Sequence, residues 1–425
     1  MVVVIRKDIM MERVLVVGGG ASGLLAAIVA AREGARVTIL ERTNRIGKKI
    51  LATGNGRCNL TNIDCNIRNF HGTNPKFALG ALTAFDPNMA IQFFEELGIS
   101  HKVESGGKVF PFSDQAGSVL DVMRMEIDRL NKEECFIEVL VDKEVEDLSK
   151  GKKSFTLKCK DDTTYYGDKV IMATGGKATP NLGSNGSGLP ILVKVGHKVV
   201  TPFPSLVQII LDTPIVKRVK GVKIQGRVRV MSDVDTREEL GEILFTEDGI
   251  SGPPVLQISR IVSAEEVRNN TCKVELDLFP DYTLEEIEVI IQMRMAYQPQ
   301  RSLEAFLIGI INKKLIPEIL KEANLNDIKR RCSSLSPQQI TALVKVLKSW
   351  QFTATGTRSW TSAQVMAGGI NTDEVCPKTL QSKKVQGLYI IGELLDIDGD
   401  CGGFNLQWAW SSAYVAAIDA VRQDK

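Results

Sequence analysis

The sequence lacks the grouped thiols that several protein classes need. Its eight cysteines are scattered along the chain, and no two form a Cys-x-x-Cys pair. A zinc knuckle, a redox-active dithiol and a disulfide framework would all require closer grouping. The cysteine pattern therefore predicts a reducing compartment, and we expect a cytoplasmic protein.

Histidine is also scarce. The three histidines are His71, His101 and His197, and none has an orienting partner close by in the sequence. Each is interpreted as a surface or structural residue. Neither a Ser-His-Asp order nor a cluster of metal ligands is recognisable. The sequence thus identifies no catalytic residue and predicts no metal site.

An excess of charge of either sign is missing as well. The chain has 53 basic and 51 acidic residues, and its few aromatic residues are not interleaved with basic clusters. We therefore expect neither a nucleic-acid partner nor a polybasic membrane anchor. Residues 14–31 carry no charge, but three glycines and Ser22 interrupt them. A buried strand followed by a packed helix explains this run better than a membrane span. Residues 1–10 are given no function.

With 425 residues, the chain is too long for one ordinary core. Its character changes near residue 197: residues 198–278 are rich in Val, Ile, Thr and turn residues, whereas residues 283–350 have a helical pattern. A glycine-rich, strand-forming style returns at about residue 355. We predict a discontinuous nucleotide-binding domain, 1–196 plus 355–425, with an insertion at 197–354.

A complete β-α-β unit occupies residues 14–41. Gly18, Gly20 and Gly23 form a GxGxxG turn between the first strand and the helix, and Glu41 ends the second strand. Gly18 permits the tight turn, Gly20 lets the backbone approach a pyrophosphate, and Gly23 lets the helix pack on the strand. Glu41 can accept hydrogen bonds from ribose hydroxyls. Together these features predict a dinucleotide site on a Rossmann-type domain.

Two later segments distinguish FAD from NAD. Residues 170–176 (VIMATGG) form a strand and turn that resemble the second FAD motif of two-dinucleotide-fold flavoproteins. Residues 387–393, Asp396 and residues 402–408 resemble their C-terminal flavin motif. There a strand brings an acidic residue to the ribityl chain, and a helix beginning near Asn405 directs its N–H groups at the flavin.

The segment 47–62 (GKKILATGNGRCNLTN) is suited to close contact with a cofactor. Its three glycines let the main chain lie against a flat ring or a pyrophosphate. Lys48, Lys49 and Arg57 offer positive charge for phosphate. Cys58 could be a redox thiol, but it has no nearby resolving cysteine, so a packing or backbone-contact role is preferred.

From Met11 onward, nearly the whole chain resembles the BaiN-type (YhiN-type) bacterial flavoproteins. Segment 47–62 is the most specific match, supported by the C-terminal block and by residues 183–188, 203–207, 241–253 and 367–370. The resemblance implies an α/β fold with a Rossmann-type FAD-binding domain. It also implies an insertion made of a β-barrel part (198–278) and a helical part (283–350). Family members are commonly described as NAD(P)/FAD-dependent oxidoreductases, and one is linked to bile-acid dehydroxylation.

These observations predict an FAD-dependent oxidoreductase, a dehydrogenase or reductase of a small organic substrate that uses hydride transfer at flavin N5. No second GxGxxG stands in a β-α-β context, so NAD(P)H would be a dissociable co-substrate. Two alternatives stay open: an oxidase that passes electrons to O₂, and a non-redox, FAD-containing RNA-associated protein. The sequence does not indicate the oligomeric state.

The predicted FAD-binding residues belong to these motifs or adjoin them. Val145 is added because it follows a strand at the place where such folds set backbone groups against adenine. The full set is Gly18, Gly20, Ala21, Ser22, Gly23, Glu41, Arg42, Lys49, Thr53, Gly54, Arg57, Cys58, Asn59, Val145, Ala173, Thr174, Gly175, Gly176, Gly392, Glu393, Asp396, Asn405, Leu406 and Gln407.

Overall fold

The computed structural model describes residues 11–133 and 136–422. The first ten residues, which were given no function, lie outside these ranges, as does Cys135. Within the described ranges, no helix combines the length and the apolar character that crossing a membrane requires. The uncharged run at residues 14–31 is a buried strand, a glycine turn and a helix, as its glycines predict.

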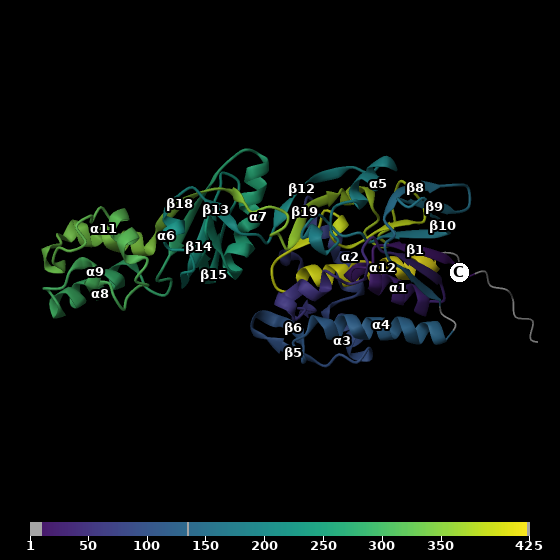
Figure 1. Cartoon of the computed structure of the whole chain (residues 1–425), viewed down its shortest axis with the longest axis horizontal. Helices are drawn as coiled ribbons and strands as arrows, with labels where there is room; N and C mark the ends of the chain where they lie inside the picture. Colours follow the sequence, from purple (N-terminus) through teal and green to yellow (C-terminus); the bar gives the residue numbers. More distant parts are fainter. Residues whose placement is uncertain (1–10, 134–135, 423–425) are drawn as a thin grey trace, which may run out of the picture. The chain divides into compact units, whose positions relative to one another are not determined.

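The chain folds into two compact units, coloured along the sequence in Figure 1. The first unit combines Met1–Pro202 with Val365–Lys425, and the second is Phe203–Gln364. The insertion predicted at 197–354 therefore begins and ends further along the chain. At the start, strand β12 (Val199–Ser205) pairs with β19 (Val365–Ile370), which keeps most of β12 in the first unit. At the end, residue 354 lies within β18 (Trp350–Thr357), a strand of the second unit's barrel.

A five-stranded parallel sheet forms the core of the first unit. Its order is β20 (Leu388–Ile390), β11 (Lys169–Met172), β1 (Arg13–Val17), β2 (Arg36–Leu40) and β7 (Ile137–Leu140). The strands are short apolar runs, as expected of a sheet covered on both faces. Four strands precede the insertion and β20 follows it, so both sequence segments of the unit build one sheet.

Three helices of this unit carry apolar surface into its core. α1 (Ala21–Arg32) is buried along almost its whole length and packs against α12 (Phe404–Arg422). Small residues dominate α1, which lets the two helices approach closely. α4 (Ala116–Lys132) is amphipathic, with buried residues at helical spacing. The remaining helices are α2 (Leu79–Ala84), α3 (Pro87–Glu96) and α5 (Gly188–Lys194).

Smaller antiparallel sheets complete the unit. They are β3 (Thr61–Asn62), β6 (Lys108–Pro111) and β5 (His101–Glu104); β4 (Phe70–His71) with β21 (Asp398–Gly399); and β8 (Val145–Lys150), β9 (Phe155–Cys159) and β10 (Thr164–Gly167). The turn at 150–153 joins β8 to β9, which pair antiparallel. Half of the residues of β8 are exposed.

The second unit begins with a closed antiparallel barrel. Its strands, in order around the barrel, are β13 (Ile209–Leu211), β16 (Gly249–Ser251), β15 (Thr236–Phe245), β14 (Lys223–Met231), β17 (Cys272–Asp277) and β18 (Trp350–Thr357). Helix α7 (Pro253–Val267) packs on β15 and β18, and a short helix α6 is formed by Ile215–Arg218. The predicted barrel part, 198–278, lacks β18, because the chain returns from the helical part to close the barrel.

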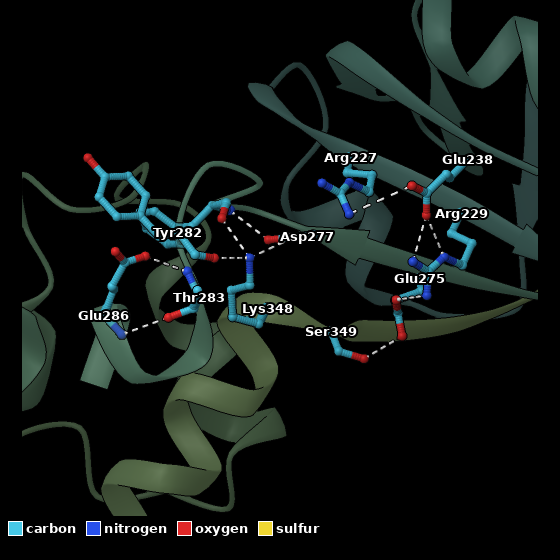
Figure 2. Close-up of polar contacts among 11 residues, drawn as sticks. Arg227, Arg229, Glu238, Glu275, Asp277, Tyr282, Thr283, Glu286, Lys348 and Ser349 are labelled. Atoms are coloured by element: carbon cyan, nitrogen blue, oxygen red, sulfur yellow. Dashed lines mark hydrogen bonds and ion pairs between the residues drawn. The ribbon is translucent and has the colours of Figure 1, made fainter. Parts of the chain in front are cut away.

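The helical part lies between β17 and β18 in the sequence. It contains α8 (Leu284–Tyr297), α9 (Leu303–Phe306), α10 (Ile316–Glu322) and α11 (Pro337–Lys348), and it shares one apolar core with the barrel. Figure 2 shows where the two parts meet. Lys348 donates hydrogen bonds to the Asp277 carboxylate at 2.8 Å and to the carbonyls of Phe279 and Tyr282. This lysine joins the end of α11 to the chain that leaves β17.

Candidate functional site

The glycines of the turn between β1 and α1 have two different roles. Gly18 and Gly23 are required by close contacts within the fold, whereas Gly20 borders empty space. A Cβ on Gly18, which has φ +106°, would lie 2.5 Å from the Ala173 oxygen, and one on Gly23 would lie 1.9 Å from the Gly18 oxygen. Gly20 has an ordinary φ of −83°, and a Cβ there would meet no protein atom within 4 Å. The chain therefore leaves open room beside Gly20, where the motif predicts the pyrophosphate.

The start of α1 is suited to an anion. Gly20 is its N-cap and makes no side-chain cap, and Ala21 and Ser22 open a first turn without acidic residues. The first N–H groups of a helix have no partner within the helix, and the helix dipole favours negative charge there. Ser22 also packs against the C-terminal motif, because a Cβ on Gly392 would lie 2.9 Å from its hydroxyl.

Glu41 is held at the glycine turn. Its carboxylate accepts hydrogen bonds from Gly19 N–H at 2.8 Å and Thr43 N–H at 2.7 Å, and its side chain is almost fully buried. The Glu41 carbonyl accepts from Lys143 N–H, two residues before Val145. The predicted ribose acceptor and the predicted adenine contact thus belong to neighbouring segments. Arg42 donates to the Gly183 carbonyl at 3.0 Å and so holds the loop before α5.

The second glycine motif adjoins the first. Ala173 N–H donates to the Val17 carbonyl, which places Thr174, Gly175 and Gly176 at the end of the central strands. Gly175 has φ +70°, and a Cβ on Gly176 would lie 2.8 Å from Met366 Cβ. These glycines allow the main chain after β11 to lie close to the end of β1 and to Met366.

Lys49 and Glu393 form an ion pair. Lys49 Nζ lies 2.8 Å from Glu393 Oε2, and the other carboxylate oxygen accepts from Met366 N–H at 2.7 Å. Gly176 N–H also faces Glu393. The sequence predicted that both side chains contact the cofactor. In the structure they form a partly buried ion pair that fastens segment 47–62 to the C-terminal motif.

Arg57 also has protein partners. It donates to Glu104 at 2.9 Å and to Asp114 at 3.2 Å, and its guanidinium lies over the ring of Phe110, 3.9 Å from the centroid. The hydrogen bond from Arg57 lowers the pKa of Glu104. The phosphate contact predicted for Arg57 is therefore not favoured, because two carboxylates already neutralise its charge. Both partners are distant in sequence, and nothing local signalled them.

Cys58 is a packing residue in this structure. It follows the 3-10 helix Ile50–Gly56, which contains Thr53 and Gly54, and has a left-handed φ of +61°. Its side chain is fully buried, and burial raises the pKa of the thiol to about 12. A thiol with this pKa stays protonated at neutral pH and is a poor nucleophile, which favours the backbone-contact role over redox chemistry.

Asn59 presents an unused acceptor inside the site. Within the described residues, its buried Oδ1 has no hydrogen-bond partner. A Cβ on Gly403 would lie 2.9 Å from this oxygen, so only glycine leaves the space open. Buried acceptors are rarely left unpaired, so a bound group that brings an N–H donor is expected. The oxidised flavin ring carries such a donor at N3.

The N-terminus of α12 faces the same region. The Asn405 side chain bonds to the backbone of Gly399 at 2.8 Å, and the fully buried Gln407 accepts from the Thr61 hydroxyl at 2.5 Å. Both side chains are used to position the helix. The N–H groups of its first turn, including that of Leu406, are the ones available to a ligand.

Asp396 and Asp400 bind the loop that contains His71. The buried Asp396 carboxylate accepts from Thr73 N–H at 2.8 Å. Asp400 Oδ1 lies 2.8 Å from His71 Nε2. The sequence analysis found no orienting partner for His71 close by in the sequence, and the structure agrees with this. The partner is 329 residues away in the sequence, so no local pattern could reveal it.

The residues present fit FAD. Room beside Gly20 and the start of α1 suit the pyrophosphate, Glu41 suits a ribose, and Asn59 with the start of α12 suits the flavin ring. All of them belong to the first unit. Across the part of the chain that the structure describes, no group of three His, Cys, Asp or Glu side chains could hold a metal ion.

Comparison with known proteins identifies the family. The model of the "HI0933-like protein Rossmann domain" matches residues 12–419, nearly the whole chain. The chain belongs to the HI0933-like family. It is an oxidoreductase with a Rossmann-type FAD-binding domain.

Three curated relatives match this member of the HI0933-like family over almost their full lengths. The 3-dehydro-bile acid delta(4,6)-reductase of Clostridium scindens is 39% identical over 97% of this chain and 100% of its own. The ribosomal RNA dihydrouridine synthase of Haemophilus influenzae is 31% identical over 96% of this chain and 98% of its own. The protein of the same name from Escherichia coli is 32% identical over 97% and 99%.

Proposed function

We propose that this chain is an FAD-dependent reductase that adds two hydrogens across a carbon–carbon double bond conjugated with a carbonyl group. The observation that carries the proposal is the pair of activities named for its relatives. A 3-oxo-4,6-diene and the uracil ring both contain such a double bond. When the double bond adjacent to the carbonyl is reduced, a hydride adds to its carbon remote from the carbonyl, and a proton adds next to the carbonyl. One active-site chemistry can therefore serve both kinds of substrate.

The residues of the first unit divide the work of holding the cofactor. The first turn of α1 and the open space at Gly20 would receive the pyrophosphate, and Glu41 would accept from a ribose. Asn59 Oδ1 and the first N–H groups of α12 would bind the flavin ring. Bound FAD supplies the hydride at N5. The Lys49–Glu393 pair holds the segments that enclose it.

The proposed electron donor is a reduced nicotinamide, NADH or NADPH, that binds and leaves as a co-substrate. The sequence contains one GxGxxG turn in a β-α-β context, at Gly18–Gly23, and the open space beside Gly20 supports its assignment to FAD. A nicotinamide donor would therefore use a surface other than a second Rossmann unit.

A small organic molecule of the steroid class is the first candidate substrate. The support is the higher identity of the bile-acid reductase, 39%, together with the nearly even charge balance of the chain, +2. Uridine in ribosomal RNA is the second candidate, favoured by the two relatives at 31% and 32% identity. For that substrate a basic binding surface would be expected.

The proposal is tested with the purified full-length chain under anaerobic conditions. We expect yellow protein whose flavin is bleached by NADH or NADPH, and whose colour returns on addition of 3-oxo-chola-4,6-dienoate. The steroid should gain two hydrogens by mass spectrometry. In a parallel reaction, protein-free ribosomal RNA is digested and analysed for dihydrouridine, which decides between the two substrates.

Two outcomes would contradict the proposal. If reduced protein is reoxidised by O₂ with peroxide release, and by neither the steroid nor the RNA, the chain is an oxidase. If the protein neither carries nor binds FAD, the cofactor assignment is wrong.

A further inference from the structure

We infer that His71, held by Asp400, is the catalytic acid that donates the proton in this reduction. The inference rests on the proposed function, because it assigns a residue to the second half of the same reaction. It comes from the structure alone, since the sequence shows no orienting partner near His71.

The two side chains form a defined pair. His71 ends β4, which pairs with β21 so that His71 lies opposite Asp398 and Phe70 lies opposite Gly399. His71 Nε2 is 2.8 Å from Asp400 Oδ1. The Asp400 side chain is only 8% exposed, whereas that of His71 is 26% exposed. The carboxylate is thus fixed in the protein, and the imidazole has one side open.

The pair is built into the proposed flavin site. Asp400 N–H donates to the Asn69 carbonyl at 2.8 Å, and Thr73 N–H donates to Asp396 at 2.8 Å. The loop 69–73 is therefore fastened at both ends to residues 396–400. That segment continues directly into α12, and Asn405 ties its backbone to the first turn of the helix.

The loop 69–73 also lies in direct main-chain contact with Asp396. A Cβ on Gly72, which has φ +140°, would lie 2.2 Å from the Asp396 oxygen. Only glycine next to His71 allows the two main chains to touch. The loop that carries His71 is thus held against the segment 396–400, which leads into the proposed flavin-binding end of α12.

The arrangement suits a proton donor. Asp400 accepts from Nε2–H, and within the described part of the chain Nδ1 of His71 has no hydrogen-bond partner. Nδ1 can therefore take a proton from water and deliver it. A buried carboxylate beside an imidazole stabilises the imidazolium and fixes the ring orientation.

The step balances as follows. Bound FAD, once reduced by a nicotinamide or another two-electron donor, would supply the hydride. A hydride then forms a C–H bond at the substrate carbon remote from the carbonyl, and the π electrons of the double bond move onto the carbonyl as an enolate. The enolate carbon next to the carbonyl takes the proton from His71 Nδ1. The imidazole is left neutral and is reprotonated by water.

The other two histidines lack these features. His101 pairs with Glu95, whose side chain is half exposed, on the β3–β6–β5 sheet. His197 is completely buried between Ser382 and Glu374. His101 is a matched control, because it is an equally exposed histidine bound to a carboxylate outside the flavin-binding segments.

The test separates the two half-reactions. His71→Gln, Asp400→Asn and His101→Gln holoproteins are reduced anaerobically by light and mixed with 3-oxo-chola-4,6-dienoate or, if the wild type prefers it, ribosomal RNA. We expect His71→Gln to slow flavin reoxidation at least about 100-fold and Asp400→Asn about 10-fold. Reduction of the flavin by the nicotinamide and FAD content should stay within about twofold of wild type, and His101→Gln should match wild type.

A second readout does not depend on turnover. At a pH where the His71 ring is neutral, NMR of ¹⁵N-histidine-labelled holoprotein should show the Nε2–H tautomer, and Asp400→Asn should shift it toward the Nδ1–H form. Because the chain has three histidines, the three single variants assign the signals.

The outcomes distinguish the two proposals. If wild-type reduced flavin is reoxidised by neither substrate, the proposed function fails, and this inference falls with it. If wild type is reoxidised and His71→Gln keeps its rate, or if His71→Gln loses FAD, the function stands and His71 is only structural.

Discussion

The two units of the chain reach stability by different routes. In the first unit, main chain lies directly on main chain at glycines, as at Gly23 against the Gly18 carbonyl, and side chains bond to backbone around an open site. In the second unit, an uninterrupted apolar core fills the barrel and continues into the helical part. A unit built around a ligand is sensitive at backbone positions, whereas a unit built around a core is sensitive at its large side chains.

The barrel surface makes the contrast visible. From Gly226 to Met231 in β14, buried residues alternate with partly buried ones. Among the latter, Arg227 and Arg229 pair with Glu238 and Glu275 on the neighbouring strands (Figure 2). Cross-strand ion pairs of this kind contribute only a few tenths of a kcal/mol to about 1 kcal/mol each. The core beneath them accounts for far more.

The largest effect is expected from Gly23→Val. A Cβ there would lie 1.9 Å from the Gly18 oxygen, and neither backbone can move without opening the β1–α1 turn. We expect destabilisation by more than about 4 kcal/mol, seen as loss of soluble protein or of cooperative thermal unfolding. Gly117→Ala in α4 is the control, since a Cβ there meets no atom within 4 Å. Gly23→Val protein with wild-type unfolding would contradict the close contact.

Phe245→Ala probes the core of the second unit. Phe245 is fully buried on β15 and packs against Trp350, with ring centroids 6.1 Å apart. We expect a loss of about 3–5 kcal/mol in the free energy of unfolding, measured with denaturant. Leu240→Ala on the same strand, where the side chain is 60% exposed, should change it by less than about 0.5 kcal/mol. Flavin absorbance of folded protein should be unaffected, because the cofactor residues belong to the other unit.

Gly20→Val tests whether the open space beside Gly20 binds the pyrophosphate of FAD. The φ of −83° suits valine, and no protein atom lies within 4 Å of the added Cβ, so the chain should fold. The branched side chain would occupy the pyrophosphate space, and FAD affinity should fall at least about 100-fold, or about 2.7 kcal/mol. Absorbance of the purified protein and titration with FAD measure this. Retention of one FAD per chain would refute the assignment.

Lys348→Met tests the junction of the barrel and helical parts. It leaves the Asp277 carboxylate, whose side chain is 9% exposed, without its cation. We expect a loss of about 2–4 kcal/mol, since removing one partner of a buried pair strands the other charge. The second change Asp277→Asn should restore part of this loss. Lys345→Met, at an exposed position of the same helix, is the control.

The smallest effect is a pH dependence from His197. Burial lowers its pKa from the ordinary value, and Glu374, 3.3 Å away, only partly opposes this. The unfolded chain binds the His197 proton more readily than the folded chain does. The contribution of neutral His197 to the free energy of unfolding is therefore fully present above about pH 6.5 and is lost as the pH falls below it. We expect the thermal midpoint of wild type to fall further between pH 7.5 and 5.5 than that of His197→Gln. An equal fall in both would contradict this.

Prediction from sequence succeeded where the signals are local. The β-α-β unit could be identified because the glycines, the apolar strand and Glu41 lie within about thirty residues of one another. The composition of residues 198–278 indicated strands and the family resemblance implied a barrel, but the closing strand β18 could not be assigned, since it follows the helices in the chain.

The sequence could not predict which side chains pair with each other when they lie far apart along the chain. Lys49 meets Glu393 across 344 residues, and His71 meets Asp400 across 329. A charged residue near a motif is naturally assigned to the ligand, because its protein partner is invisible in the sequence. Arg57 is an example: the sequence predicted a phosphate contact, and the structure adds the partners Glu104 and Asp114.

The position of α12 sets the order of events during synthesis. The helix that would receive the flavin ring begins at Phe404, whereas the turn for the pyrophosphate lies at Gly18–Gly23. A ribosome must therefore translate the whole insertion before the pocket exists, and an interrupted polypeptide cannot become coloured. FAD binding would therefore indicate that the ribosome has synthesised the chain as far as α12.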